Sequence, residues 1–405
     1  METSDIWPLQ RGCPLLPPPR LAEIREQQPV APVELYDGTR CALVTRYADI
    51  RAVVVRGDVS ADGHRENFPY ASEAARAGRG ARMAFDRMDP PRHDEHRFML
   101  AAHFTTKRVA EMQPFLDRLV YELLDRMAAA GPPADLVRDF AEPLPAAVIT
   151  EILGLPRADS AFFQDRVHTW FDDSSTAEDV ATANADLIGY ISSVLDERKE
   201  ASSAGTGNDG QPEDLITTLV REQFVPGHLS RQELLDMIQL LIAAGYDTTA
   251  NMIALGTTVL LQTDGAWRQL TDDPDSVATA VEELLRFVSP AHHAVFRVAN
   301  TDVAVGEEVI PAETPIIAST MAANHDPQKY ADPSRLDLRR NARGHLAFGI
   351  GLHQCLGQAL ARAELQSVFT HLPSRFPSLR LAAAIEELSF RNSLVYGLDS
   401  LPVSW

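Results

Sequence analysis

The chain has 405 residues, 45% of them hydrophobic and 23% charged, so it is long enough to bury a large core and a prosthetic group. Its formal net charge of −20 argues against a nucleic-acid-binding role, because binding phosphate requires a basic face. The three cysteines, Cys13, Cys41 and Cys355, are odd in number and far apart, which predicts a reducing, cytoplasmic setting rather than a disulfide framework.

The N-terminal part of the chain predicts a small β region. The first twenty residues are proline-rich without an apolar run, so we expect neither a signal peptide nor a membrane anchor. An Asp37–Gly38 turn joins two short alternating runs and predicts a hairpin with about five residues per strand. Residues 60–82 are expected to form a long loop or an irregular helix.

Helical periodicity dominates the middle of the chain. Apolar residues recur at three- and four-residue spacing through HDEHRFMLAAHF, VAEMQPFLDRLVYELLDRMAAA and AEPLPAAVITEILGL. Residues 204–214 have the composition of a flexible loop. A capping box at Ser230 and Glu233 opens a helix that we expect to end near Gly265 and to span about 50 Å. Because this helix carries Asp247 among other polar residues, we expect it to be buried in protein rather than in a membrane.

The last third of the chain mixes both kinds of element. A helix over VATAVEELLRFVSP is expected to stop before Pro290. Strand-like runs follow at 295–305 and 314–324, then a loop over 326–345. A helix begins after Cys355, and the tail has hairpin character. The fold class is therefore expected to be mainly α with a minor β part.

The stretch AFGIGLHQCLGQ, residues 347–358, surrounds one cysteine with Gly349, Gly351 and Gly357 at the start of a helix. A buried cysteine usually packs as a small hydrophobe, but this spacing of glycines is unusual. A helix N-terminus stabilises a thiolate, and glycines let the backbone pass close to a large flat ligand. One sulfur ligand without partners fits tetrahedral zinc poorly and fits the axial position of a haem well.

FGIGLHQCLG resembles the haem-thiolate signature of the cytochrome P-450 monooxygenases, and the resemblance, to the soluble actinobacterial branch, extends along nearly the whole chain. It implies a fold in which haem lies between a long central distal helix and the proximal helix that bears the cysteine. It implies haem b with Cys355 as the iron ligand, His353 paired with a propionate and Phe348 beside the sulfur. Gly349 and Gly357 are implied to give the haem clearance.

The same resemblance implies one haem domain over residues 1–405. We expect it to comprise a β-containing part over about 1–60, a helical core over about 83–290 and a mixed C-terminal part with the haem loop over about 291–405.

The motif AAGYDTT, residues 243–249, lies midway along the long helix. Taken alone, Gly245 costs the helix about 1 kcal/mol relative to alanine, and Thr248 is able to bond back to a carbonyl. The resemblance implies instead that the motif lies over the distal face of the haem. Ala244 and Gly245 would leave room for dioxygen, Thr248 would hold it, and Asp247 would help to deliver protons.

Glu283 and Arg286 share one helix face at a spacing of three residues. Alone, such a pair is usually exposed and contributes little stability. The resemblance implies a buried structural pair that bonds to the loop before the cysteine. Its third partner is expected to be Arg335 or Arg339.

Pro90 and Pro91, in MDPPRHDEHRF, predict the start of a helix that places His93 and Arg97 on one face. Alone, this would be a solvated basic face. The resemblance implies that both residues, together with Arg297, bind haem propionates, a role suited to the guanidinium fork.

The activity implied is insertion of one atom of dioxygen into a large apolar substrate, by hydroxylation or epoxidation, in secondary metabolism such as antibiotic biosynthesis or in xenobiotic oxidation. The protein would act as a monomer, with electrons from a ferredoxin and its reductase. The ferredoxin would dock on a basic patch near the matched motifs: Arg92, Lys107, Arg108, Arg339, Arg340, Arg343 and Arg362. Candidate substrate contacts are Phe85, Trp170, Phe171, Leu240, His292, His293, Val295, Phe296 and Leu394.

Two alternatives stay open. One is a haem enzyme of the same fold that performs peroxide-driven chemistry or another oxidation, such as ring formation or coupling. The Asp247–Thr248 pair argues against it, because such an enzyme needs no proton relay coupled to dioxygen. The other is a non-catalytic haem-binding protein, which would show no turnover with ferredoxin and dioxygen.

Overall fold

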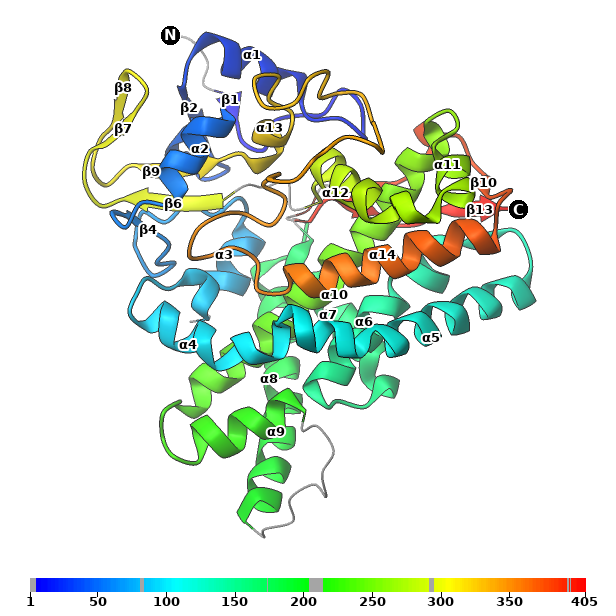
Figure 1. Cartoon of the computed structure of the whole chain (residues 1–405). Helices are drawn as coiled ribbons and strands as arrows, with labels where there is room; N and C mark the ends of the chain where they lie inside the picture. Colours follow the sequence, from blue (N-terminus) through cyan, green and yellow to red (C-terminus); the bar gives the residue numbers. More distant parts are fainter. Residues whose placement is uncertain are drawn as a thin grey trace.

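The computed structural model describes residues 5–80, 84–172, 174–203, 214–290, 295–391, 393 and 395–405. A β-rich part that contains the N-terminus adjoins a larger helical part (Figure 1). This arrangement confirms the expected fold class, mainly α with a minor β part. Most of the loop expected over 204–214 lies outside the described residues.

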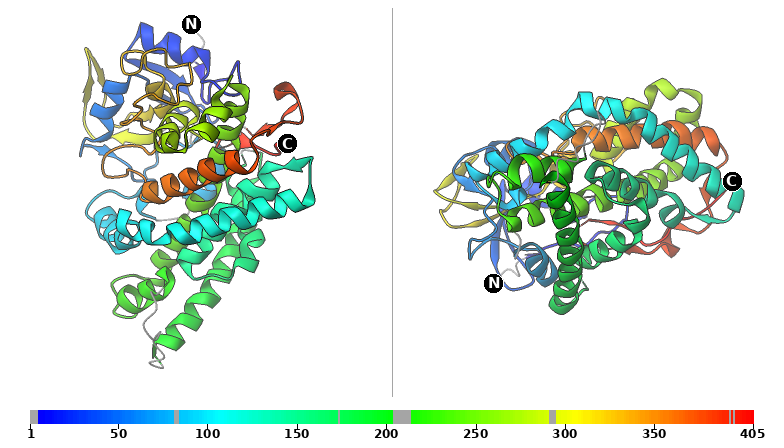
Figure 2. Two further views of the ribbon diagram at one scale, coloured as in Figure 1. Left: turned by 45° about the vertical axis from the view of Figure 1, so that its right-hand side comes forward. Right: turned by 90° about the horizontal axis from the view of Figure 1, so that it is seen from below.

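Helices make up most of the molecule. Their bounds are α1 Pro19–Gln27, α2 Tyr47–Val54, α3 Glu73–Gly80, α4 Arg92–Ala101, α5 Thr106–Ala130, α6 Pro143–Leu153, α7 Ser160–Phe171, α8 Ala177–Ser203, α9 Leu215–Leu219, α10 Arg231–Gln262, α11 Ala266–Asp272, α12 Val277–Val288, α13 Thr320–Asn324 and α14 Gln358–Arg375. Helices α5 and α14 run side by side in each view (Figures 1 and 2).

Helix α10 is the long helix that the sequence predicts. The Ser230 hydroxyl accepts a hydrogen bond from the Glu233 N–H and the Glu233 carboxylate accepts one from the Ser230 N–H, which confirms the capping box. Residues on all sides of α10 are buried, because it packs against α6, α7, α8, α12 and α14. Helix α10 ends at Gln262, close to the predicted end near Gly265, and Gly265, with φ of 73°, directly precedes α11.

The strands form one six-stranded sheet in the order β1-β2-β3-β9-β6-β4 and three smaller sheets. Their bounds are β1 Asp5–Ile6, β2 Val30–Glu34, β3 Arg40–Val44, β4 Val59–Ser60, β5 Ala134–Asp135, β6 Val295–Ala299, β7 Val303–Val305, β8 Glu308–Ile310, β9 Pro315–Ala318, β10 Arg380–Leu381, β11 Phe390–Arg391, β12 Gly397–Leu398 and β13 Pro402–Ser404.

Both predicted hairpins are present. Strands β2 and β3 have five residues each and pair antiparallel, with Val30 opposite Val44 and Glu34 opposite Arg40. In the tail, β11 pairs antiparallel with β12. The strand predicted over 314–324 is only half right, because it ends at Ala318. Ser319 then caps α13 by accepting a hydrogen bond from the Ala322 N–H, so a helix begins where strand was expected.

Candidate active site

The loop before α14 is shaped by two glycines in left-handed conformations, Gly349 with φ of 65° and Gly351 with φ of 78°. The Gly349 N–H donates to the carbonyl of Leu346, and the Cys355 N–H donates to the carbonyl of Phe348, at 3.0 and 2.9 Å. These turns bring Cys355 to a point just before the first turn of α14. Gly357, with φ of −81°, needs no special conformation, so its expected role depends on clearance for a ligand.

The Cys355 thiol is exposed, although protein surrounds it closely enough for burial to raise its pKa. Three features oppose the effect of burial on its pKa: a hydrogen bond from the Gly357 N–H and the positive charges of Arg97 and Arg362. The site therefore supplies the electrostatic support that a thiolate needs.

Five basic side chains gather beside this thiol; we call Arg87, His93, Arg97, Arg297 and His353 the cationic cluster. Helix α4 contributes His93 and Arg97, strand β6 contributes Arg297, and the cysteine loop contributes His353. The rings of His93 and His353 lie 4.3 Å apart between centroids. The structure thus brings together all four of the basic residues predicted from sequence.

Most of the cationic cluster is buried: Arg87, His93 and Arg297 are buried, whereas Arg97 and His353 are half-buried. Asp94 contacts only one side of the His93 ring, at Nδ1. Arg297 is 4% exposed, and burial together with the charge of Arg87 lowers its pKa to about 9. Burial and the neighbouring cations lower the pKa of His353 to about 2. His93 Nε2, His353 Nδ1 and Arg87 Nε are buried without a hydrogen-bond partner. Buried donors and like charges of this kind require an anionic ligand.

The two propionates of a haem meet this requirement, and the Cys355 sulfur beside them suits its iron, so the residues present fit the group. Arg87 is a member of the cationic cluster that the sequence did not reveal. It lies in a short 3₁₀ turn, Phe85–Arg87, just before α4. An arginine that is only 7% exposed marks an internal role, but sequence alone does not show burial.

The middle of α10 is more exposed than the turns on either side of it. Ala244 is exposed and Thr248 is half-buried, whereas the flanking turns are buried. The Thr248 hydroxyl donates to the Ala244 carbonyl at 2.9 Å, the back-bond expected from sequence. Gly245 has a packing role as well, because a Cβ there would lie 2.9 Å from Ile149 Cδ1 on α6.

Asp247 faces away from water and is held by polar neighbours. It is 2% exposed, and burial raises the pKa of its carboxyl group. The Asn251 amide donates to Asp247 Oδ1 at 3.0 Å and to the Asp247 carbonyl at 2.9 Å. His168 Nε2 and Arg391 Nη1 each lie 3.9 Å from Oδ1. His168 and Arg391 come from distant segments, so no local sequence signal reveals them.

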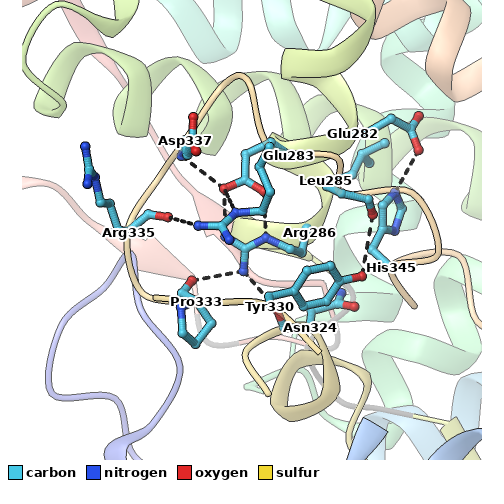
Figure 3. A network of polar contacts seen from close by, with 12 residues as sticks. Glu282, Glu283, Leu285, Arg286, Asn324, Tyr330, Pro333, Arg335, Asp337 and His345 are labelled. Carbon is cyan, nitrogen blue, oxygen red and sulfur yellow. Dashed lines mark hydrogen bonds and ion pairs between the residues drawn. The ribbon is translucent and has the colours of Figure 1, made fainter. Parts of the chain in front are cut away.

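Glu283 and Arg286 form the buried structural pair that was expected; both side chains are fully buried, with Arg286 Nε 2.7 Å from Glu283 Oε2. Arg286 also donates to the carbonyls of Asn324 and Pro333 (Figure 3). The prediction of Arg335 or Arg339 as third partner is wrong. Arg340 Nε lies 3.1 Å from Glu283 Oε1, and Arg335 contributes only its carbonyl, to Arg340.

A second carboxylate beside this pair ties α12 to the cysteine region. His345, in the loop, and Arg362, on α14, both bind Glu282 (Figure 3 shows the contact with His345). Burial opposes ionisation of Glu282, but the hydrogen bonds from His345 and Arg362 lower its pKa to about 2. Arg362 also covers the ring of Phe348, with 4.5 Å from its Cζ to the ring centroid.

The basic patch proposed from sequence is smaller than expected. Arg340 and Arg362 bind Glu283 and Glu282, and Arg92 binds Glu233 and Glu95. Arg108 pairs with Glu111. The remaining members, Lys107, Arg339 and Arg343, are exposed.

The candidate substrate contacts have mixed environments. Phe85, Trp170, Phe171, Leu240 and Phe296 are buried, and Val295 is half-buried. Phe85 lies 6.2 Å from the His93 ring, which places it beside the cationic cluster. His292, His293 and Leu394 lie outside the described residues. Within the part of the chain that is described, no helix is long and apolar enough to cross a lipid bilayer.

Comparison with known proteins gives matches along the whole chain. The family model described as cytochrome P450 matches residues 147–381. Cytochrome P450-SU2 of Streptomyces griseolus is 41% identical over 97% of this chain and 95% of its own length. Vitamin D3 dihydroxylase of the same organism is 39% identical over 100% of this chain and 98% of its length. The crystal structure of the mycinamicin VIII C21 methyl hydroxylase MycCI from Micromonospora griseorubida matches with a TM-score of 0.91 and 33% identity, covering 99% of this chain and 100% of that one.

Proposed function

Because this chain belongs to the cytochrome P450 family of haem-thiolate monooxygenases, we propose that it hydroxylates a large apolar organic molecule, such as a secondary metabolite or a foreign compound. Similar proteins named as hydroxylases of vitamin D3 and mycinamicin VIII support this substrate class. The observation that carries the assignment of the site is Cys355, a thiol that is enclosed yet accessible and lies beside the buried cationic cluster. In this proposal all 405 residues form one haem domain.

When bound, the haem supplies the activation of dioxygen. Cys355 would hold the iron, and the cationic cluster would bind the propionates and thereby fix the orientation of the ring. The overall reaction consumes two electrons and two protons for each oxygen atom inserted, and water is the second product. Asp247 would supply these protons. The Thr248 hydroxyl, which donates to the Ala244 carbonyl in the structure, would turn toward the distal space to pass them on.

We propose that the electrons come from a ferredoxin that binds beside the cysteine loop. Lys107, Arg339 and Arg343 are exposed, and two large apolar side chains are exposed as well. Phe98 on α4 is 83% exposed and Leu352, next to His353, is 52% exposed. Exposed apolar and cationic side chains are the kinds of group that an electrostatically steered, transient interface uses.

Charge reversal tests this docking surface. Arg339→Glu and Arg343→Glu should each slow reduction by an acidic ferredoxin by about fivefold at low salt, and less at high salt, because screening removes the attraction. Arg268→Glu is the matched control, since Arg268 is equally accessible but lies on α11 and pairs with Asp272. Equal slowing by all three variants, or reduction that is insensitive to salt, would reject the surface.

The substrate class is tested by titrating the haem-loaded protein with a panel of ligands while recording its absorption spectrum. Bulky apolar secondary metabolites should shift the spin state of the iron, whereas small polar compounds should not. Product analysis with ferredoxin, reductase and dioxygen then identifies the oxidised position. A protein that binds haem but forms no product with any of the shifting ligands would favour the non-catalytic alternative.

We also propose that the protein works in the cytoplasm. The support is the state of its thiols: Cys13, Cys41 and Cys355 are all free, and Cys13 is exposed, as expected for a reducing compartment.

A further inference from the structure

His168, on α7, places one imidazole nitrogen among three oxygens. Its Nε2 lies 3.2 Å from the Tyr246 hydroxyl, 3.3 Å from Glu142 Oε1 and 3.9 Å from Asp247 Oδ1. Tyr246 and Asp247 are neighbours on α10, and Glu142 immediately precedes α6. Two separate segments therefore converge on a single side chain that accepts and releases protons.

A second set of groups surrounds the same oxygen, Asp247 Oδ1. Arg391, on β11, lies 3.9 Å from Asp247 Oδ1 and 3.9 Å from Glu142 Oε1, and it donates to Asn251 Oδ1 at 3.2 Å. Arg391 Nε also lies 3.4 Å from Asp399 Oδ1. On its own helix, the nearest charge to His168 in sequence is Arg166, which is engaged by Asp165 and by Asp186 of α8.

The exposed fractions of these side chains indicate which of them is able to exchange protons with water. Asp247 is 2% exposed, so we expect a proton from water to reach it through a neighbouring side chain, and Glu142, at 18% exposed, is less accessible than His168. Arg391 is 20% exposed, but a guanidinium does not release a proton in a protein. The His168 side chain is 35% exposed, and imidazole is the side chain that exchanges protons readily near neutral pH.

We propose that His168 is the residue through which protons enter the site, a role that rests on the proposed function of Asp247. In this step the Nε2–H bond of the His168 imidazolium breaks, an Oδ1–H bond forms on Asp247, and His168 regains its proton from water. A water molecule or a small side-chain rotation spans the 3.9 Å gap. Tyr246 and Glu142 orient the imidazole, and Asn251 and Arg391 hold the carboxylate.

Burial also gives the transfer its direction. Burial raises the pKa of Asp247, although the charges of Arg391 and His168 oppose the effect, so this carboxyl group accepts a proton more readily than an exposed one. The protonated carboxyl group is a hydrogen-bond donor, and Thr248, one residue further along α10, is its acceptor in this proposal. The ionised form is then re-formed beside Arg391 and His168, ready for the next proton.

The test compares His168→Gln with the parent in the haem-loaded enzyme. Product formation should fall by at least about tenfold, and its solvent isotope effect should rise about twofold, because proton transfer becomes limiting. Substrate affinity and melting temperature should stay within the parental range, which a purely structural role would not predict. His371→Gln is the control, because His371 also contacts a carboxylate, Asp117, at 3.3 Å, but does so on α14.

A double variant separates this inference from the proposed function. If His168 acts through Asp247, His168→Gln should have no further effect in an Asp247→Asn background. In the carbon monoxide adduct, the nitrogen-15 signal of His168 Nε2 should also move in Asp247→Asn. A parent that makes no product refutes the proposed function. A parent that turns over normally, with an isotope effect that His168→Gln leaves unchanged, refutes the role of His168.

Discussion

Cys355 and Cys41 show how neighbours decide the chemistry of a thiol. Burial raises the pKa of both. For Cys41 the nearby negative charge of Asp37 adds to the effect and the pKa reaches about 12, so this thiol stays neutral in the sheet core. For Cys355 the Gly357 N–H and two cations act in the opposite direction. Only the second setting suits a metal ligand.

Thr248→Ala should uncouple electron use from product formation, because the hydroxyl would transfer protons between Asp247 and the distal space. We expect product per electron consumed to fall about fivefold or more, with peroxide or water formed instead. Thr258→Ala is the matched control, since Thr258 makes the same back-bond on α10, to Ala254 at 2.8 Å, in a fully buried turn. Equal product yield per electron in Thr248→Ala and parent would contradict this role.

At the scale of elements, the loop before α14 is fixed to α12 by the buried Glu283 carboxylate, which binds Arg286 and Arg340. Removal of Arg340 leaves Glu283 paired with Arg286 but takes away a buried hydrogen bond to a charged group, which contributes about 1.5–3 kcal/mol. Arg340→Ala should therefore lower the free energy of unfolding by about 2 kcal/mol, and the haem should be lost more readily. Denaturant unfolding measures the first effect, and transfer of haem to an acceptor protein measures the second.

The neighbouring residue provides the control. Arg339 is exposed, and its substitution by alanine should change the free energy of unfolding by less than about 0.5 kcal/mol. If the two variants were equally destabilised, the structural assignment of Arg340 would be wrong.

Elements were predictable from sequence where the signal was local. The Ser230–Glu233 capping box marks the start of α10, and the Asp-Gly turn marks the β2–β3 hairpin, because a few adjacent residues determine each. Arg340 was missed because Arg335, Arg339 and Arg340 all belong to one loop, and only its path decides which side chain reaches Glu283. His168 and Arg391 were missed for the same reason, since they meet Asp247 from 79 and 144 positions away in the chain.

At the scale of the whole molecule, one buried carboxyl group links stability to pH. Glu364, on α14, is 2% exposed, and its Oε2 has no hydrogen-bond partner. Burial raises its pKa to about 8, above the ordinary value of 4.5. As the pH rises, the unfolded chain therefore loses this proton at a lower pH than the folded protein does. The stability that this group contributes below pH 4.5 is lost progressively up to about pH 8.

Glu364→Gln should remove this dependence. The variant should be more stable than the parent by about 3 kcal/mol at pH 8, with a difference that shrinks toward pH 5. Melting temperatures measured across this range give the comparison. Glu386→Gln, at an exposed position, should follow the parent at every pH. Parallel curves for Glu364→Gln and parent would show that Glu364 is ionised in the folded protein.

At the centre of the molecule, Cys355 would ligate a haem whose propionates are held by the cationic cluster. The absorption spectrum of the reduced carbon monoxide adduct tests this ligation most directly, in the parent and in Cys355→His. The parent should show the long-wavelength band of a thiolate-ligated haem, and Cys355→His should retain haem but show the band of an imidazole-ligated one. The same spectrum in both proteins, or a parent that binds no haem, would contradict the account.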